Sequence, residues 1–191
     1  GLSLDLSRVD FASDFFEQKT ESIDKALAAM AKLEQGAIAN PDEKRMVGHY
    51  WLRKPELAPS AEISQQIIST IENVKAFAAA IHSGEVSGAD GLFENVIVIG
   101  IGGSALGPQF VSHALGKPKE DRMKMWFFDN TDPDGIDKVI DNIGSDLGKT
   151  LCIVISKSGG TKETRNGMLE AKVAYERVGL NFGEHACAVT G

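Results

Sequence analysis

Two hydrophobic patterns divide the chain near residue 90. Up to that point apolar positions recur at helical spacing, whereas beyond it short, wholly apolar runs alternate with helical segments. The clearest helical stretch follows Ser60, a suitable N-cap, and ends at Ser83 and Gly84. Its apolar face comprises Ile63, Ile67, Ile68, Ile71, Val74, Phe77, Ala78 and Ile81. We therefore expect a helical extension over residues 1–90 and a separate domain over residues 91–191.

The rest of the extension gives weaker signals. Helical spacing predicts another helix over residues 11–33, which Gly36 and Pro41 would end. Residues 37–59 contain three prolines. We expect them to form an ordered connection between the two helices, with one short helix around residues 43–50. We expect Tyr50 and Trp51 to anchor this region to a core.

The second part of the chain has the pattern of an α/β domain. Apolar runs begin at Val96, Met125, Leu151 and Ala186. Helical patterns lie between them, at about residues 107–115, 134–143 and 163–178. The runs are apolar at every position, as strands buried on both faces require. This alternation predicts a doubly wound parallel sheet in a three-layer α/β/α domain.

Two glycine-rich segments carry the candidate chemistry. Residues 100–108 (GIGGSALGP) and 156–164 (SKSGGTKET) each follow an apolar run and open a helical pattern. A turn of this kind presents backbone N–H groups at the positive end of a helix dipole, where phosphate binds. The second segment adds the hydroxyls of Ser156, Ser158, Thr161 and Thr164 and the cations Lys157, Lys162 and Arg165. Together the two segments indicate a site for a phosphorylated small molecule, at the carboxyl ends of adjacent strands.

Two simpler interpretations remain beside this one. The hydroxyls of the second segment fit turn and capping roles, and Thr161 is well placed to cap the following helix. The first segment also fits a loose dinucleotide fingerprint, Gly100-x-Gly102-x-x-Ala105, with Asp129 as the acid for a ribose. That fingerprint leaves Ser104 and the whole second segment unexplained. Neither segment ends in the Gly-Lys-Ser/Thr of a Walker loop.

Composition narrows the classes of partner. The net charge of -7 argues against nucleic acids and anionic membranes, so an anionic ligand needs a local concentration of positive charge. Cys152 and Cys187 lie in apolar runs without a metal-site spacing, and no apolar run has the length of a signal peptide or a membrane span. We expect a reduced, cytoplasmic protein without a metal. The acidic cluster Asp129, Asp132 and Asp134 is better explained by turn and N-cap duty.

The segments at residues 99–108, 130–135 and 156–164, with 48–51 and 81–85, closely resemble the bacterial-type glucose-6-phosphate isomerase family. The resemblance runs from about residue 45 to the end of the chain. It implies a sugar isomerase (SIS) domain of flavodoxin-like topology, preceded in the sequence by a helical N-terminal extension. It further implies interconversion of glucose 6-phosphate and fructose 6-phosphate in a cytoplasmic homodimer, without a cofactor. The sequence alone keeps open the alternative of a stand-alone sugar-phosphate-binding SIS sensor module.

Carried over by position, the resemblance assigns a set of substrate-binding residues: Gly103, Ser104, Ser156, Lys157, Ser158, Thr161 and Thr164. It gives Glu163 a supporting role, orienting the histidine that opens the sugar ring. The family's glutamate base, ring-opening histidine and lysine, and enediolate-stabilising arginine have no counterpart in these 191 residues. The chain ends on a strand-like run, as if cut within a longer protein, and we expect it to be inactive alone. Ala105, Gly159 and Gly160 depart mildly from the family pattern.

Overall fold

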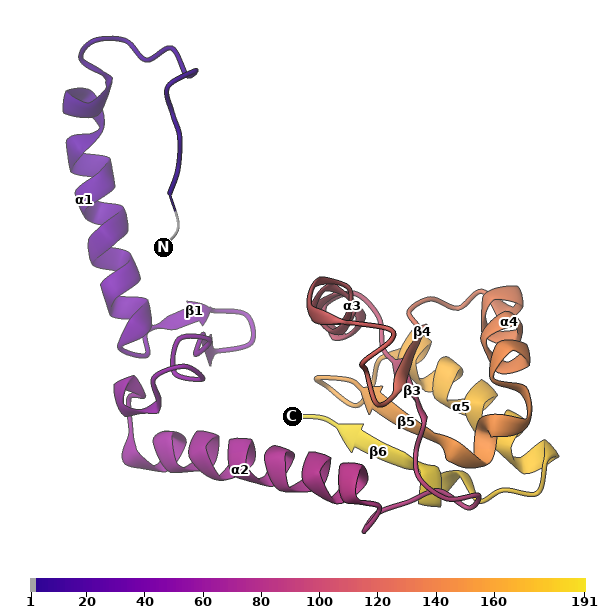
Figure 1. Cartoon of the computed structure of the whole chain (residues 1–191). Coiled ribbons are helices and arrows are strands. Elements are labelled where there is room, and N and C mark those ends of the chain that lie inside the picture. The colour runs from indigo at the N-terminus through magenta and orange to yellow at the C-terminus, as the bar shows by residue number, and fades with distance from the viewer. Residues whose placement is uncertain (1–2) are drawn as a thin grey trace. The chain divides into compact units, whose positions relative to one another are not determined.

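The N-terminal part of the chain is helical apart from one hairpin. In the computed structural model, which describes residues 3–191, the chain divides into one unit ending at Lys75 and a second unit, Ala76–Gly191 (Figure 1). The elements up to residue 83 are α1 (Phe15–Glu34), β1 (Ile38–Asn40), β2 (Arg45–Met46), a 3-10 helix (Pro55–Leu57) and α2 (Ala61–Ser83). Among residues 3–191, no helix combines the length and the hydropathy that a membrane span requires.

The two long helices begin and end where the sequence signals lie. The Ser60 hydroxyl accepts a hydrogen bond from the Ile63 N–H at 3.2 Å, which confirms Ser60 as the cap of α2. Gly84 follows the last residue of α2 with φ of +81°, a conformation that favours glycine. The α1 helix likewise ends just before Gly36.

The short helix predicted around residues 43–50 is wrong. Strands β1 and β2 pair there as an antiparallel hairpin, with Ile38 opposite Met46. The Asn40 side chain accepts from the Glu43 N–H at 3.0 Å, and Lys44 adopts a left-handed φ of +52°. An Asx turn followed by a left-handed residue reverses the chain, and this local geometry overrides the helical propensity of the surrounding residues.

Trp51 is the anchor of the first unit, as predicted. Its side chain is buried, and its indole N–H donates to the Glu34 carbonyl at the end of α1, at 2.9 Å. That bond satisfies both the buried indole and one of the orphan carbonyls of the helix end. The α1 side chains Ile23, Leu27 and Met30 remain exposed.

A four-stranded parallel sheet forms the centre of the second unit. Its strands are β3 (Asn95–Ile99), β4 (Lys124–Phe128), β5 (Thr150–Ile155) and β6 (Ala186–Val189), in the spatial order β4-β3-β5-β6. This is the order of a flavodoxin-like sheet, in which the first strand in sequence pairs with both the second and the third. The predicted α/β class, strand positions and topology are confirmed.

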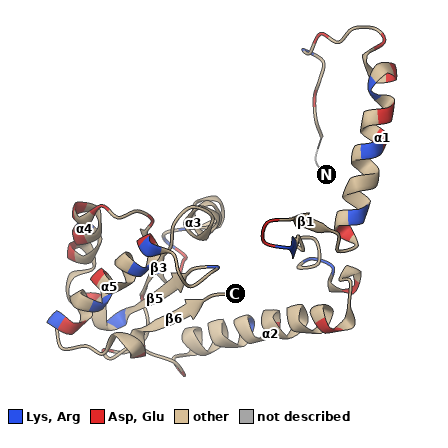
Figure 2. Cartoon of the chain, turned by 180° about the vertical axis from the view of Figure 1, so that it is seen from behind, with Lys and Arg blue, Asp and Glu red and all other residues tan. Residues whose placement is uncertain are grey.

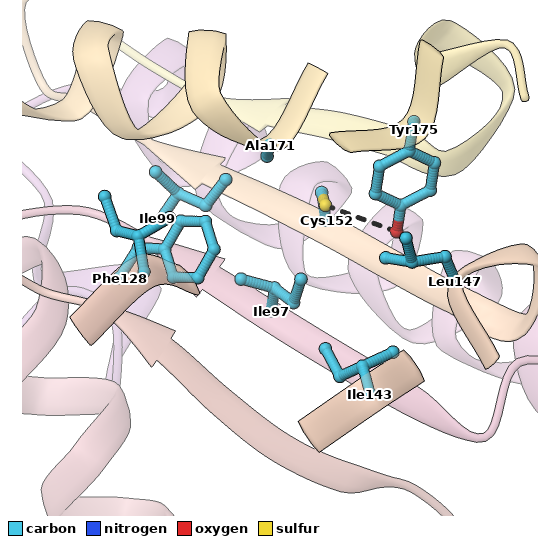
Figure 3. Close-up of a cluster of buried hydrophobic side chains, with 9 residues drawn as sticks. Ile97, Ile99, Phe128, Ile143, Leu147, Cys152, Ala171 and Tyr175 are labelled. Carbon is cyan, nitrogen blue, oxygen red and sulfur yellow. Dashed lines mark hydrogen bonds between the residues drawn. The ribbon is translucent and has the colours of Figure 1, made fainter. Parts of the chain in front are cut away.

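Helices cover both faces of this sheet. Figure 1 shows α3 (Gly103–Leu115) on one side, and α4 (Pro133–Ile143) and α5 (Lys162–Arg177) on the other. Alternate residues of each strand point to opposite faces, so Ile97 and Ile99 enter the core beneath α4 and α5. That core also contains Phe128, Ile136, Ile143, Leu147, Cys152, Ala171 and Tyr175 (Figure 3). On the other face, Leu151 packs with Ile81 and Phe93.

A polar chain of hydrogen bonds crosses the main core beneath α5. The Tyr175 hydroxyl donates to the Thr150 carbonyl at 2.8 Å and accepts from the Cys152 thiol at 3.6 Å (Figure 3). Buried His185 places Nδ1 3.2 Å from the same carbonyl, so this histidine has a packing role. Burial raises the pKa of the Cys152 thiol from its ordinary value of 9.0 to about 12. The buried thiol therefore stays protonated and behaves as a small apolar group.

The Cys152 thiol makes stability depend on pH on the alkaline side. Its pKa is higher in the folded state, so its contribution is complete below about pH 9 and is lost as the pH rises toward about 12. We expect the free energy of unfolding to fall more steeply over this range in the wild type than in Cys152→Ala. Urea titrations at several pH values measure both slopes. Equal slopes would show that the thiol has no raised pKa.

Candidate functional site

The pairing of β3 with β5 brings the two glycine-rich loops to one edge of the sheet. Ile99 lies opposite Val154, so residues 100–103 and 156–161 leave adjacent parallel strands at their carboxyl ends. The strand order reverses at this pair, and the crevice outside such a switch point is where doubly wound sheets bind ligands. The predicted placement of the two loops is confirmed.

The first loop combines a tight turn with an open helix N-terminus. Gly102 caps α3 with φ of +55°, and the adjacent Gly103 has no atom within 4 Å of the place a Cβ would take. A Cβ on Gly100 would approach Ser104 Cβ to 2.9 Å, so glycine lets the half-buried Ser104 fold back on the strand end. Gly102 has no side chain to cap the helix, and the Ser104 and Ala105 N–H groups donate to the carbonyls of Ile101 and Gly102, at 3.2 and 3.0 Å. The Gly103 N–H at the start of α3 is the donor that this loop leaves for a ligand.

The second loop is a closed turn held by its own hydroxyls. Buried Ser156 donates to Thr161 Oγ1 at 3.1 Å, and the Ser158 hydroxyl accepts from the Gly160 N–H at 3.2 Å. Gly159 has φ of +68° and donates its N–H to the Ser156 carbonyl at 3.2 Å. Ser158 therefore does have the turn role of the simpler interpretation. Its O–H proton is not used in that bond and can point to a ligand.

Thr161 does not act through its side chain as a helix cap. It occupies the N-cap position of α5, but within the described chain its side chain makes no capping hydrogen bond. Its hydroxyl lies against Ser156 instead, at 3.1 Å. The capping interpretation of this threonine therefore fails on geometry, and the N–H groups of the first turn of α5 remain open to an anion.

Thr164, in that first turn, carries a buried hydroxyl without a partner. The residue is 4% exposed, and among residues 3–191 its Oγ1 is the buried side-chain oxygen or nitrogen that makes no hydrogen bond. Leaving such a group unpaired costs about 1–3 kcal/mol. Native proteins usually satisfy buried polar atoms, so an orphan beside a candidate loop points to an external acceptor.

The charges around the second loop favour an anion. Lys157, Lys162 and Arg165 are exposed there, against the single carboxylate of Glu163. In Figure 2 the first turns of α5 carry blue segments, whereas α4 carries red ones. The positive end of the α5 dipole adds to the same field. Glu163 is exposed in the first turn of α5, and its predicted role in orienting a histidine stays a prediction.

The ladder between β5 and β6 continues into this loop. The Ser156 N–H donates to the Val189 carbonyl at 3.0 Å, and the Gly191 N–H donates to the Lys157 carbonyl at 3.1 Å. Helix α5 is also pulled close to the sheet, because a Cβ on Gly167 would lie 3.1 Å from Ile99 Cγ2. These contacts fix both ends of the second loop.

The structure gives the acidic residues after β4 other partners than a ribose or a metal. Asp129 accepts from the Gln109 amide at 2.6 Å and from Asn130 Nδ2 at 2.9 Å. Asp132 caps α4 by accepting from the Gly135 N–H at 3.2 Å, as the sequence predicted. Among the described residues, no group of three or more His, Cys, Asp or Glu side chains is arranged to hold a metal ion.

A 400 Å³ hollow lies between α4 and α5, and none of the predicted substrate-binding residues lines it. Its lining includes Thr131, Asp137, Asn166 and Glu170, but none of the hydroxyls of the second loop. Two carboxylates, those of Asp137 and Glu170, line it, which makes it a poor receptor for an anion. The loop pair is therefore the better candidate site.

The chain is similar to sugar phosphate isomerases along its whole length. A family model described as "Phosphoglucose isomerase" matches residues 10–189. Glucose-6-phosphate isomerases of Geobacter sp. (strain M21) and Geobacter sulfurreducens are 59% and 61% identical over all of this chain, which spans 36% of their length. The crystal structure of a glucose-6-phosphate isomerase from Chlamydia trachomatis superposes with a TM-score of 0.78 at 27% identity, covering 95% of this chain and 35% of that one. This chain belongs to the phosphoglucose isomerase family.

Proposed function

We propose that the chain is the substrate-phosphate-binding portion of an isomerase that interconverts glucose 6-phosphate and fructose 6-phosphate through an enediolate. Family membership supports the reaction class. The observation that carries the proposal for this chain is the orphan hydroxyl of Thr164, buried beside a basic, hydroxyl-lined loop at the switch point of the sheet. A phosphate oxygen is the kind of acceptor that would satisfy it.

The two loops supply complementary donors. The first offers the Gly103 N–H and the Ser104 hydroxyl, and the second offers the hydroxyls of Ser158, Thr161 and Thr164 together with Lys157. Ser156 donates its own O–H to Thr161 and so holds that hydroxyl in place for the phosphate. Held between them, the phosphate fixes the far end of the sugar. Binding energy gained away from the reacting carbons then orients C1 and C2 for proton transfer.

The chemical step needs groups that these 191 residues do not supply. Moving a proton between C1 and C2 requires a positioned base and a stabiliser for the enediolate. By resemblance those groups belong to a part of the family sequence without counterpart here, and Glu163 supports them only indirectly. We propose that the parent protein works in the cytoplasm as a homodimer, without a cofactor and without nucleic-acid or membrane partners.

The phosphate-binding role predicts which hydroxyls matter. Ser158→Ala and Thr161→Ala should each weaken glucose 6-phosphate binding by about 1–3 kcal/mol, because each removes a hydrogen bond to a charged acceptor. Calorimetric titration of this chain measures the effect. Ser145→Ala is the matched control, since Ser145 is exposed in the 3-10 helix before β5, at the opposite edge of the sheet.

A parallel titration with NAD separates the sugar-phosphate site from a dinucleotide site. We expect no NAD binding, because Asp129 is already held by two amides. NAD affinity that is unaffected by Thr161→Ala, with no affinity for glucose 6-phosphate, would reverse the assignment.

The chain alone should not isomerise its ligand. In an assay that couples fructose 6-phosphate consumption to detection of glucose 6-phosphate, we expect the background rate even at high protein concentration. A full-length member of the family serves as the positive control. Turnover by this chain near that enzyme's rate would show that the catalytic groups lie within residues 1–191.

A further inference from the structure

One hydrogen bond links helix α3 to the end of the neighbouring strand β4. Gln109 Nε2 donates to Asp129 Oδ2 at 2.6 Å, and Asn130 Nδ2 donates to the other oxygen of the same carboxylate at 2.9 Å. Gln109 and Asp129 are both half-buried. The bond lies on the carboxyl edge of the sheet, where Asp129 follows the last residue of β4 and the Gly100 N–H donates to the Phe128 carbonyl at 3.1 Å.

Few other contacts hold α3 in place. Of residues 103–115, all of them described, Ala105 is the one buried residue, and Leu106, Phe110 and Leu115 are 64%, 72% and 75% exposed. Gly107 and Pro108 also weaken the middle of the helix. A hydrogen bond to a carboxylate contributes more than burial of a single methyl group. The Gln109–Asp129 bond is therefore a principal determinant of where this helix sits.

The position of α3 decides what the first loop presents to a ligand. Ser104 and the Gly103 N–H belong to its first turn, and the glycines at 102 and 103 leave the backbone at this turn flexible. We propose that Gln109 and Asp129 are positioning residues for phosphate binding, which hold the first turn of α3 against the second loop. The inference rests on the proposed function, because it names residues that support the same site.

The pair also controls a negative charge beside the site. The two amides direct the Asp129 carboxylate toward Gln109 and Asn130. Without Gln109 the carboxylate would lose its shorter hydrogen bond, from the Gln109 amide. Its negative charge would then be less well stabilised and would repel an anionic ligand more strongly. Gln109→Met, which keeps the side-chain length but removes the donor, should therefore act on both loop order and affinity. Asp129→Asn removes the charge but keeps an oxygen for Gln109, so its effect should be smaller.

A double-mutant cycle on the 191-residue chain tests the proposal. Calorimetry with glucose 6-phosphate should show about tenfold weaker binding in Gln109→Met, with little further loss when Asp129→Asn is added. Amide hydrogen exchange of the unliganded chain should be about tenfold faster at residues 102–106 in Gln109→Met, and unchanged in the strands. His113→Gln, on an exposed position of the same helix, should alter neither readout.

The two readouts separate this inference from the function on which it rests. If the wild type binds no glucose 6-phosphate, the proposed function fails, and the exchange data still decide whether the pair orders the loop. Unchanged exchange at residues 102–106 in Gln109→Met would overturn the inference. Exchange that rises uniformly through residues 76–191 would overturn it as well, because it would mark an ordinary contribution to stability. Additive losses in the cycle would also contradict a pair that acts as one unit.

Discussion

The parallel pairing of β3 with β5 is the constraint on which the candidate site depends. Ile97 and Ile99 are fully buried in β3, and the register with β5 carries the two chains to the same edge of the sheet. Two loops that are more than fifty residues apart in sequence thereby come to lie beside each other. Because β3 is buried throughout and β5 is buried over its first three residues, a slip in register would break many contacts at once. The core therefore fixes the position of the loops.

Helix α5 joins that core to the ligand-binding chemistry. Ala171 and Tyr175 pack into the sheet, and the missing side chain of Gly167 allows the helix to approach Ile99. The same helix places the unpaired hydroxyl of Thr164 and its own positive end at the second loop. The well-packed C-terminal half of α5 thus supports an N-terminal turn whose Thr164 hydroxyl lacks a hydrogen-bond partner among residues 3–191, which is a common arrangement at binding sites. On the other face of the sheet, α3 buries one residue, Ala105, so its position depends more on a polar contact, the Gln109–Asp129 bond.

Sequence patterns predicted the parts of this fold that depend on periodicity and on local turn chemistry. Fully apolar runs gave the strands, and Ser60, Gly84 and Asp132 gave helix ends, because each acts on its nearest neighbours. The prediction failed at residues 43–50, where an Asx turn at Asn40 and the left-handed Lys44 form a hairpin. The roles of individual site residues were harder to predict from the sequence. The contact of Thr161 with Ser156 depends on the turn at Gly159, and the bond of Gln109 to Asp129 joins elements that only the sheet brings together.

The candidate site requires that the two loops bind one phosphate between them. Backbone amide chemical shifts of the isotope-labelled chain, followed by NMR as glucose 6-phosphate is added, test it directly. The N–H signals of residues 102–104 and 158–164 should shift together along a single saturation curve. Inorganic phosphate should move the same signals, since the phosphate group is what the loops recognise. Shifts confined to one loop, or centred on the hollow between α4 and α5, would contradict it.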